Sequence, residues 1–397
     1  MANLSQSYGS HHGGAGAAQR AHPPETESGR RAGVRRPDVA APDLVAVEQT
    51  IAEASAALAQ LQKPDGEWCF ELEADSTIPA EYILLEHFLG ETDTGLEAKL
   101  ARYLRQAQGT HGGWPLFYDG DFDMSASVKA YYALKLAGDD PGAAHMARAR
   151  AAILAKGGAA RANVFTRFGL ALFGQVPWRA VPAMPIEIML LPRGAPFHLD
   201  KVSYWSRSVI VPLLVLAALK PRAVNPLAIG IAELFVTPPD EERDYLKNPT
   251  GSTWGEILLA IDGALKFGER FFPAEPRKRA IEKALEFIRQ RLNGDDGLGA
   301  IYPAMANTVM VFATLGQDAD QPERATAMRA VRKLVVERDD VAYCQPCVSP
   351  VWDTALALHA MMETGEPGHK DLQVKAGQWL LDRQVLDVVG DWAAQRP

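Results

Sequence analysis

The stretch Gln-Lys-Pro-Asp-Gly-Glu-Trp at residues 62–68 decides the fold of this chain, because it recurs as Gln-Gly-Thr-His-Gly-Gly-Trp at residues 108–114. Each copy follows an amphipathic segment with helical spacing and precedes a more uniformly apolar segment that ends in glycine, at Gly90 and Gly138. The two tryptophans lie 46 residues apart and the two closing glycines 48 apart. A constant period of this size indicates a repeated pair of helices.

Weaker copies extend this repeat toward the C-terminus. A third copy runs over residues 277–316 with Leu298 in the tryptophan position, and a fourth covers 324–365 without the turn. A fifth begins at Leu372 and has no second helix before Pro397. Glutamine and tryptophan near a helix end can cap free backbone groups and cover the neighbouring helix. We therefore expect a structural role for the following turn residues: Gln62, Gly66, Trp68, Gln108, Gly112, Trp114, Gln384, Gly390 and Trp392.

The alternation of amphipathic and apolar helices predicts an all-α fold with two concentric layers, an α/α toroid with the apolar helices inside. Residues 1–42 contain almost no large apolar side chains and are expected to be a disordered tail. We expect 43–70 to be a helical segment that packs with a second toroid, and 71–345 to form a first, near-complete toroid. Residues 346–397 would form the incomplete start of the second toroid.

Composition narrows the class of protein. The chain has 397 residues, of which 47% are hydrophobic and 23% charged, with a net charge of −8. A chain with a net negative charge is a poor partner for nucleic acid, because neutralising phosphates requires clustered lysine and arginine. Three cysteines are too few for a disulfide framework. The apolar runs 209–219 and 226–236 are too short to span a bilayer, and they predict either a membrane-facing insert near 205–236 or a buried, proline-bent helix pair.

Several residue clusters could form a metal, redox or hydrolase site, but each lacks further residues that such a site needs. Cys344 and Cys347 have the spacing of metal and redox sites, but no second cysteine pair accompanies them. The adjacent pair His11 and His12 has no further ligands at a suitable spacing. We therefore expect no metal and no cofactor. Paired carboxylates would suit a glycoside hydrolase, although such acids are more often helix caps. The carboxylates in question are Glu71, Glu73, Asp119, Asp121 and Asp123.

A more informative segment is Ser-Pro-Val-Trp-Asp-Thr at residues 349–354. Serine followed by proline is a typical helix start, so Trp352 and Asp353 are expected in the first turn of an inner helix, facing a cavity. Trp205 has a similar position before an apolar helix. The face of a tryptophan ring attracts cations, most strongly in a dry cavity. Either residue alone would more often be an ordinary core tryptophan.

These motifs, together with Pro-Ala-Met-Pro-Ile-Glu-Ile-Met at 182–189 and Gly-Ala-Ile-Tyr-Pro at 299–303, resemble squalene–hopene cyclase, a class II triterpene cyclase family. The resemblance covers 43–397. It implies that an acid protonates squalene and starts a ring-closing carbocation cascade that ends as hopene or hopanol. It also implies monotopic binding to one leaflet, at the cytoplasmic face of the inner membrane, and is compatible with a homodimer. By motif matching, the cavity residues are Trp205, Ile301, Tyr302, Pro303, Trp352 and Asp353.

The sequence departs from the family in three places. Lys129 stands where some members carry a glutamate of a polar network, and Tyr302 where some carry glutamine. The family's acid is the middle aspartate of an Asp-x-Asp-Asp string, which residues 293–296 and 337–340 only approximate. We therefore expect no catalytic acid in this chain, with the acid lying beyond Pro397, and no activity from the chain alone. The alternative is a non-catalytic toroid scaffold that binds an isoprenoid or a protein.

Overall fold

The computed structural model describes residues 43–248, 251–294 and 296–386. The predicted tail, the pair His11 and His12, and the turn residues Gly390 and Trp392 lie outside these ranges. The regular elements, in chain order, are the helices α1 (Leu44–Gln60), α2 (Thr77–Leu89), α3 (Thr94–Gln106), α4 (Met124–Leu136), α5 (Ala144–Ala155), α6 (Val164–Leu172), α7 (Tyr204–Leu219), α8 (Thr253–Gly268), α9 (Ala274–Arg291), α10 (Tyr302–Thr314) and α11 (Pro322–Arg332), the strands β1 (Val335–Glu337) and β2 (Ala342–Cys344), and the helices α12 (Pro350–Glu363) and α13 (Lys370–Asp382).

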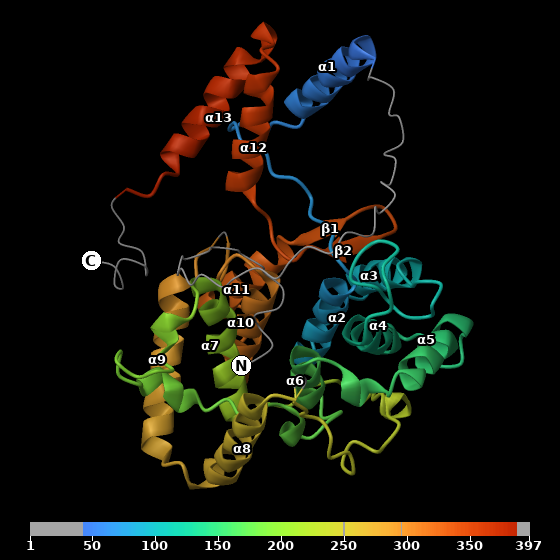
Figure 1. The fold of residues 1–397 in the computed structure, drawn as a ribbon, viewed down its shortest axis with the longest axis vertical. Coiled ribbons are helices and arrows are strands. Elements are labelled where there is room, and N and C mark those ends of the chain that lie inside the picture. Colours follow the sequence, from blue (N-terminus) through green and yellow to red (C-terminus); the bar gives the residue numbers. More distant parts are fainter. Residues whose placement is uncertain (1–42, 249–250, 295, 387–397) are drawn as a thin grey trace, which may run out of the picture.

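Five helices, α2, α4, α6, α7 and α10, surround a central cavity, and we call them the inner ring (Figure 1). The last of them, α10, packs against the first, α2. Within the ring α2 contacts α4, α4 contacts α6, and α7 contacts α10. An outer layer covers it, with α3 and α5 against α4, α9 against α7, and α11 against α10. This is the predicted all-α toroid.

Burial follows the layers as the hydrophobic patterns predict. Eleven of the 13 residues of α4 are buried, as expected for a helix that packs on all sides. Only four of the 18 residues of α9 are buried, and they lie along one face, at Ala280, Ala284, Leu285 and Ile288. Apolar helices therefore line the ring, and amphipathic helices separate it from solvent.

The apolar run 209–219 lies within the ring. It forms most of α7, and its residues Val211 and Leu213–Leu216 are at most 5% exposed. Pro212 is tolerated in the middle of this buried helix. The second run, 226–236, is mostly irregular, with Ile231 and Leu234 buried. The burial of the first run is that of the alternative, a buried helix that contains a proline, and a membrane-facing insert near 205–236 stays a prediction.

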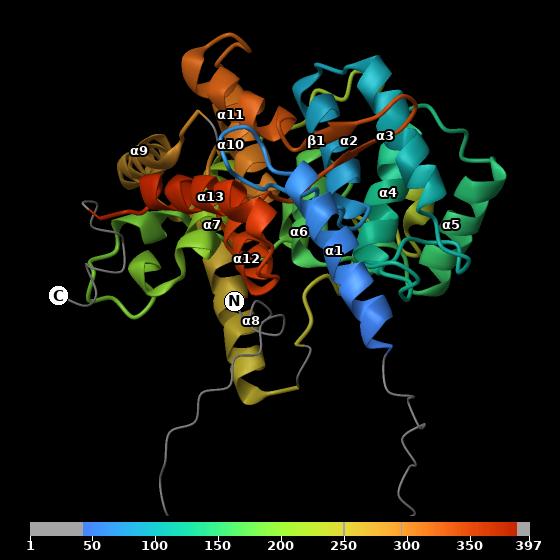
Figure 2. The same ribbon diagram turned by 90° about the horizontal axis from the view of Figure 1, so that it is seen from above.

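Helices α1, α12 and α13 form a separate layer above the ring (Figures 1 and 2). Their small core consists of Trp68, Ala357, Met361 and Ala376, with Leu58 packed against it. Two stretches of chain, 68–75 and 345–349, connect this layer to the ring. The expected domain limits at residues 70 and 345 stay predictions.

A short antiparallel hairpin, not expected from the sequence, lies beside α3. It pairs β1 with β2 in the register Val336 to Tyr343. Ion pairs hold it to α3, with Lys99 Nζ 2.6 Å from Glu337 and Arg102 3.0 Å from Asp340. The acidic string at 337–340 thus lies on a surface hairpin.

Candidate active-site cavity

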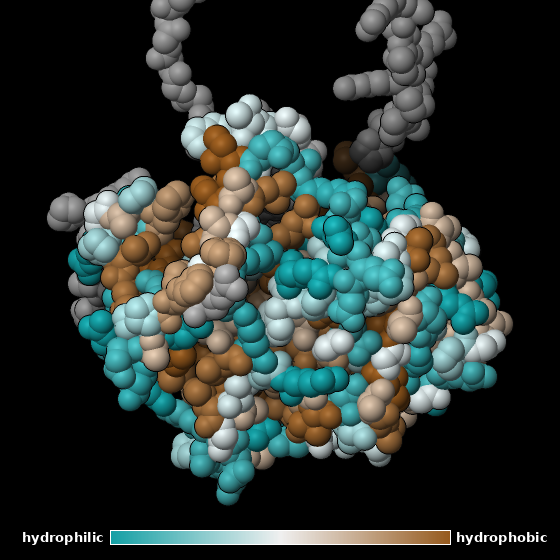
Figure 3. All heavy atoms as spheres, turned by 90° about the horizontal axis from the view of Figure 1, so that it is seen from below, coloured by the Kyte–Doolittle hydropathy of each residue, from teal (hydrophilic) through white to brown (hydrophobic). Residues whose placement is uncertain are grey.

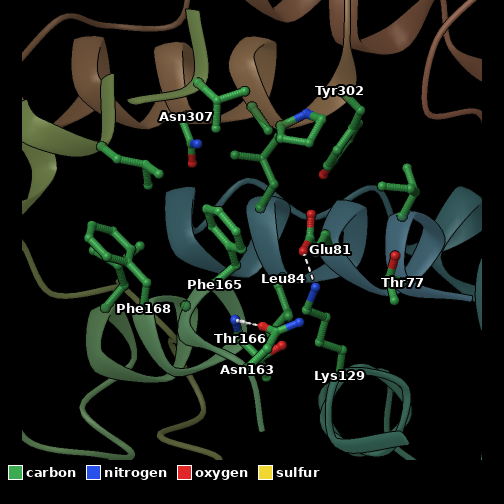
Figure 4. Close-up of a pocket in the computed structure, with 18 of the residues that line it drawn as sticks. Thr77, Glu81, Leu84, Lys129, Asn163, Phe165, Thr166, Phe168, Tyr302 and Asn307 are labelled. Carbon is green, nitrogen blue, oxygen red and sulfur yellow. Dashed lines mark hydrogen bonds and ion pairs between the residues drawn. The ribbon is translucent and has the colours of Figure 1, made fainter. Parts of the chain in front are cut away.

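The ring encloses an apolar cavity of about 550 Å³ (Figure 4). Its walls come from all five inner helices and from the segment before α10. Four of the six predicted cavity residues line it, namely Trp205, Ile301, Tyr302 and Pro303. An apolar hollow of this size with few polar groups is typical of a site for a hydrophobic small molecule.

Aromatic side chains form a large part of the wall. Phe165 and Phe168 project from α6 into the cavity, where Figure 4 shows both rings on the same side. Trp205, in the first turn of α7, is 61% exposed and packs edge-on against Tyr204 with ring centroids 6.0 Å apart. The face of an aromatic ring attracts a cation by about 0.5–1 kcal/mol at an exposed site and by about 2 kcal/mol or more where water is excluded. These rings can therefore stabilise a cation in the cavity.

One end of the cavity is polar. Lys129 of α4 and Glu81 of α2 form an ion pair, with Nζ 2.5 Å from Oε1. Their side chains are only 10% and 28% exposed, and the dashed line in Figure 4 joins them. The hydroxyl of Tyr302 points toward the same end. Glu81 gave no sequence signal, because a lone glutamate at helical spacing resembles any surface residue.

Trp352 and Asp353 lie outside this cavity, in the layer above the ring. Trp352 is 72% exposed. The Asp353 carboxylate accepts hydrogen bonds from the backbone N–H of Phe70, at 2.9 Å, and from the Ser349 hydroxyl, at 3.0 Å. Within the described residues, Asp353 therefore ties α12 to the chain that follows Trp68.

The two repeat turns are built alike. Trp68 and Trp114 are both fully buried. The Gln108 side-chain amide donates to the backbone oxygens of Gly112, at 2.7 Å, and His145, at 2.9 Å. Gln62 donates to Gly66, at 3.0 Å, and to a residue of α13, at 2.9 Å. The turns are structural, whereas the exposed Gln384 makes no comparable contact among the described residues.

Both glycines that end these turns have positive φ, at +104° for Gly66 and +88° for Gly112. A Cβ on Gly66 would lie 2.7 Å from the backbone oxygen of Lys375, and one on Gly112 would lie 3.1 Å from that of Arg148. Each turn therefore fits against its outer helix only with glycine.

The other chemical interpretations find no support in the geometry. The cysteines Cys69, Cys344 and Cys347 are unpaired, and burial raises the pKa of all three thiols. No group of three histidine, cysteine or acidic side chains suited to a metal occurs in the part of the chain that the structure describes. Several of the carboxylates have other partners: Tyr343 donates to Glu71, Tyr103 donates to Glu73, and Asp123 caps α4.

The fold and the cavity define a toroid that encloses a hydrophobic ligand site, and comparison with known proteins gives the family. The family model of the squalene–hopene cyclase N-terminal domain matches residues 51–340, and that of the C-terminal domain matches 348–397. The chain belongs to the squalene–hopene cyclase family.

Curated relatives show the same relationship. The squalene–hopene cyclase of Bradyrhizobium diazoefficiens is 56% identical over 353 residues, which is 88% of this chain and 54% of the relative. That of Zymomonas mobilis is 54% identical over 358 residues, 88% of this chain and 54% of the relative. That of Alicyclobacillus acidocaldarius is 35% identical over 354 residues, which is 89% of this chain and 55% of the relative. The chain spans about half the length of these relatives.

Proposed function

We propose that the protein cyclises squalene to hopene or hopanol and that this chain supplies one wall of the reaction cavity. The observation that carries the proposal is the apolar, aromatic-lined cavity inside the ring of a member of this family. A hydrocarbon substrate gains free energy on entering such a cavity through the hydrophobic effect. Exclusion of water protects a carbocation until the last ring has closed.

The two ends of the cavity suit different stages of this reaction. Phe165, Phe168 and Trp205 offer ring faces to the cations of the cascade. The polar end, with Glu81 and Lys129, suits termination, where the last cation loses a proton or takes up water. The cascade also requires a strong acid in a dry site. Because the sequence contains no Asp-x-Asp-Asp string, we propose that this chain alone does not cyclise squalene.

Product analysis tests this proposal. Squalene is incubated with this chain and, in parallel, with the complete product of the gene, and the extracts are analysed by gas chromatography and mass spectrometry. We expect no hopene or hopanol from this chain, and hopene or hopanol from any product of the same gene that includes an Asp-x-Asp-Asp string. Hopene from the chain alone would contradict the missing acid, and no cyclised product from either protein would contradict the cyclase assignment.

We further propose that α8 docks the protein on one membrane leaflet, at the cytoplasmic face of the inner membrane. None of the residues of α8 is buried. Its exposed apolar side chains recur at helical spacing, at Trp254, Ile257, Leu258 and Ile261, and Trp254 is 74% exposed. Hydrophobic patches are visible on the face seen from below, where α8 lies (Figure 3). Within the described residues no helix is both long and apolar enough to cross a bilayer.

Vesicle binding tests the docking proposal. The chain and its Ile257→Glu/Ile261→Glu variant are sedimented with phospholipid vesicles, with Glu256→Gln, on the same helix, as the control. We expect the affinity of the double variant for vesicles to fall by at least about tenfold. Two apolar side chains that would insert into the membrane are replaced by charged ones. Equal binding of the double variant and the parent would show that α8 is not the docking surface.

The alternative expected from the sequence, a non-catalytic toroid scaffold that binds an isoprenoid or a protein, stays a prediction. Tight binding of squalene to the complete gene product without any turnover would support it. Homodimerisation stays a prediction, to be checked by analytical ultracentrifugation.

A further inference from the structure

Two tyrosine hydroxyls beside the polar end of the cavity are buried without hydrogen-bond partners. Tyr302, the first residue of α10, lines the cavity and is fully buried. Tyr82 of α2, next to Glu81 in sequence, is also fully buried. Neither hydroxyl has a partner within ordinary hydrogen-bond distance among the described residues, although the guanidinium of Arg332, at the end of α11, lies close enough to the Tyr82 hydroxyl to oppose part of the rise in its pKa. Buried polar groups are nearly always satisfied, so internal water is the expected partner of each.

The face of α2 that carries Tyr82 also carries a buried carboxyl group, one helical turn further along. Glu86 lies four residues after Tyr82, on the same face of the helix, and is 1% exposed. One of its oxygens accepts the backbone N–H of Asp93 at 3.3 Å. Asp93 is the exposed N-cap of α3. Glu86 is therefore the last buried group before solvent.

The pKa of Glu86 is raised to about 7, mainly because the carboxyl group is buried. The charges of Asp93 and Glu97 contribute to this rise, whereas the Asp93 N–H and the charge of Arg332 oppose it. Tyr302 is within electrostatic range of Tyr82, Glu86 and Glu81. A carboxyl group that titrates near neutral pH can both accept and release a proton under physiological conditions.

We propose that Tyr302, Tyr82 and Glu86, bridged by internal water, form a proton path from the polar end of the cavity to the surface at Asp93. The proposal rests on the cyclase function proposed above. When the last cation loses a proton, a C–H bond breaks and its electron pair becomes the new double bond. When water adds instead, the added oxygen gives up a proton. In both cases one proton must leave the cavity.

The path conducts this proton without any charged tyrosine. Each hydroxyl accepts a proton on one side while it donates its own on the other, so burial of Tyr302 and Tyr82, which raises their pKa values, does not block it. Glu86 then takes the proton and releases it to water at Asp93. Glu81 and Lys129 lie at the inner end, where they favour ordered water. Tyr82 and Glu86 thus carry the proton without touching the substrate, because neither lines the cavity.

Steady-state kinetics of the complete gene product test the path. The variants are Tyr82→Phe and Glu86→Gln, each of which removes one proton-carrying group and keeps the shape of the side chain. The matched control is Glu242→Gln, a buried carboxyl group that is paired with Arg161 at 3.2 Å and lies off the path. We expect kcat to fall at least about tenfold in both path variants with KM unchanged. Glu86→Asp, or added imidazole buffer, should restore part of the rate, which a merely structural role would not allow.

A second measurement needs no turnover. A high-resolution crystal structure of this chain should show water within hydrogen-bond distance of both hydroxyls and of Glu86. Infrared spectra should show a protonated carboxyl band at pH 6 that disappears in Glu86→Gln. Dry hydroxyls, or unchanged kcat in both path variants of an active enzyme, would overturn the path. A parent enzyme that makes no cyclised product would overturn the proposed function instead, and the crystal structure would still decide whether the path holds water.

Discussion

The inner ring and the three-helix layer above it contain the same turn, but the turn contacts nearby residues of the chain in the ring and distant ones in the layer. In the ring, the Trp114 backbone N–H donates to Ser127 of α4, at 2.9 Å and 13 residues downstream. In the layer, the Trp68 N–H donates to Thr354 of α12, also at 2.9 Å but 286 residues downstream. The indole N–H of each tryptophan donates to the helix before it, Trp114 to Leu104 and Trp68 to Leu58.

This comparison shows that the turn determines how two helices pack against it, and not which helices of the chain they are. Each turn contacts two helices. A hydroxyl group at the start of the first helix accepts the tryptophan N–H, and the backbone of the second helix contacts the glutamine and the glycine. For the second turn these helices follow directly along the chain. For the first turn they are α12 and α13, so α1 packs far from its neighbour in sequence, α2.

The largest effect is expected from Trp114→Ala, because this side chain is fully buried in the large core of the ring. Removal of a buried tryptophan costs about 3–5 kcal/mol. We expect the global free energy of unfolding, measured by urea denaturation, to fall by that amount. A loss below about 1 kcal/mol would show that the turn is not part of the ring core.

Trp68→Ala should separate the two regions. Among the described residues, the buried members of its core are Trp68, Ala357, Met361 and Ala376, so this part of the chain has little other apolar burial to hold the layer. In hydrogen exchange followed by mass spectrometry, we expect α1, α12 and α13 to lose protection while α4 and α10 keep theirs. Simultaneous loss in the ring would mean that both regions unfold as one unit.

Glu86→Gln tests whether the stability of the ring depends on pH through this one buried carboxyl group. An unfolded glutamate releases its proton near pH 4.5, whereas folded Glu86 keeps it up to about pH 7. The folded state thus binds more protons between these values, so stability falls as pH rises from about 4.5 to 7 and then levels off. The total loss is at most about 3 kcal/mol. We expect Glu86→Gln to remove this slope in thermal unfolding of the ring, and a persistent slope would contradict the raised pKa.

The smallest effects are expected at the two hydroxyls that receive the tryptophan N–H groups. Ser127→Ala and Thr354→Val each leave a buried N–H without its acceptor, which costs about 1–3 kcal/mol. Ser127→Ala should lower global stability, and Thr354→Val should lower only the protection of the three-helix layer. Equal effects of both variants on the ring would remove the distinction between the two regions.

The helix layers could be predicted from the sequence because the spacing of apolar residues within each helix shows how much of its surface is buried. The partner of the first turn could not, since nothing local to residues 62–68 identifies contacts with Thr354 and Leu372. Trp205, Ile301, Tyr302 and Pro303 were chosen by motif and line the cavity. Glu81, Tyr82 and Glu86 had no sequence signal, because their roles depend on which face of α2 the ring turns inward.

The long separation between Trp68 and its partners has a consequence for biosynthesis. Translation proceeds at about 5–20 residues per second, so α1 leaves the ribosome roughly 15 s to 1 min before α12 and α13 exist. During this time the indole of Trp68 and the apolar residues of α1 have no native surface to cover. The nascent chain therefore carries an exposed hydrophobic helix while the ring forms behind it, and a chaperone that shields this helix would raise the yield of folded protein.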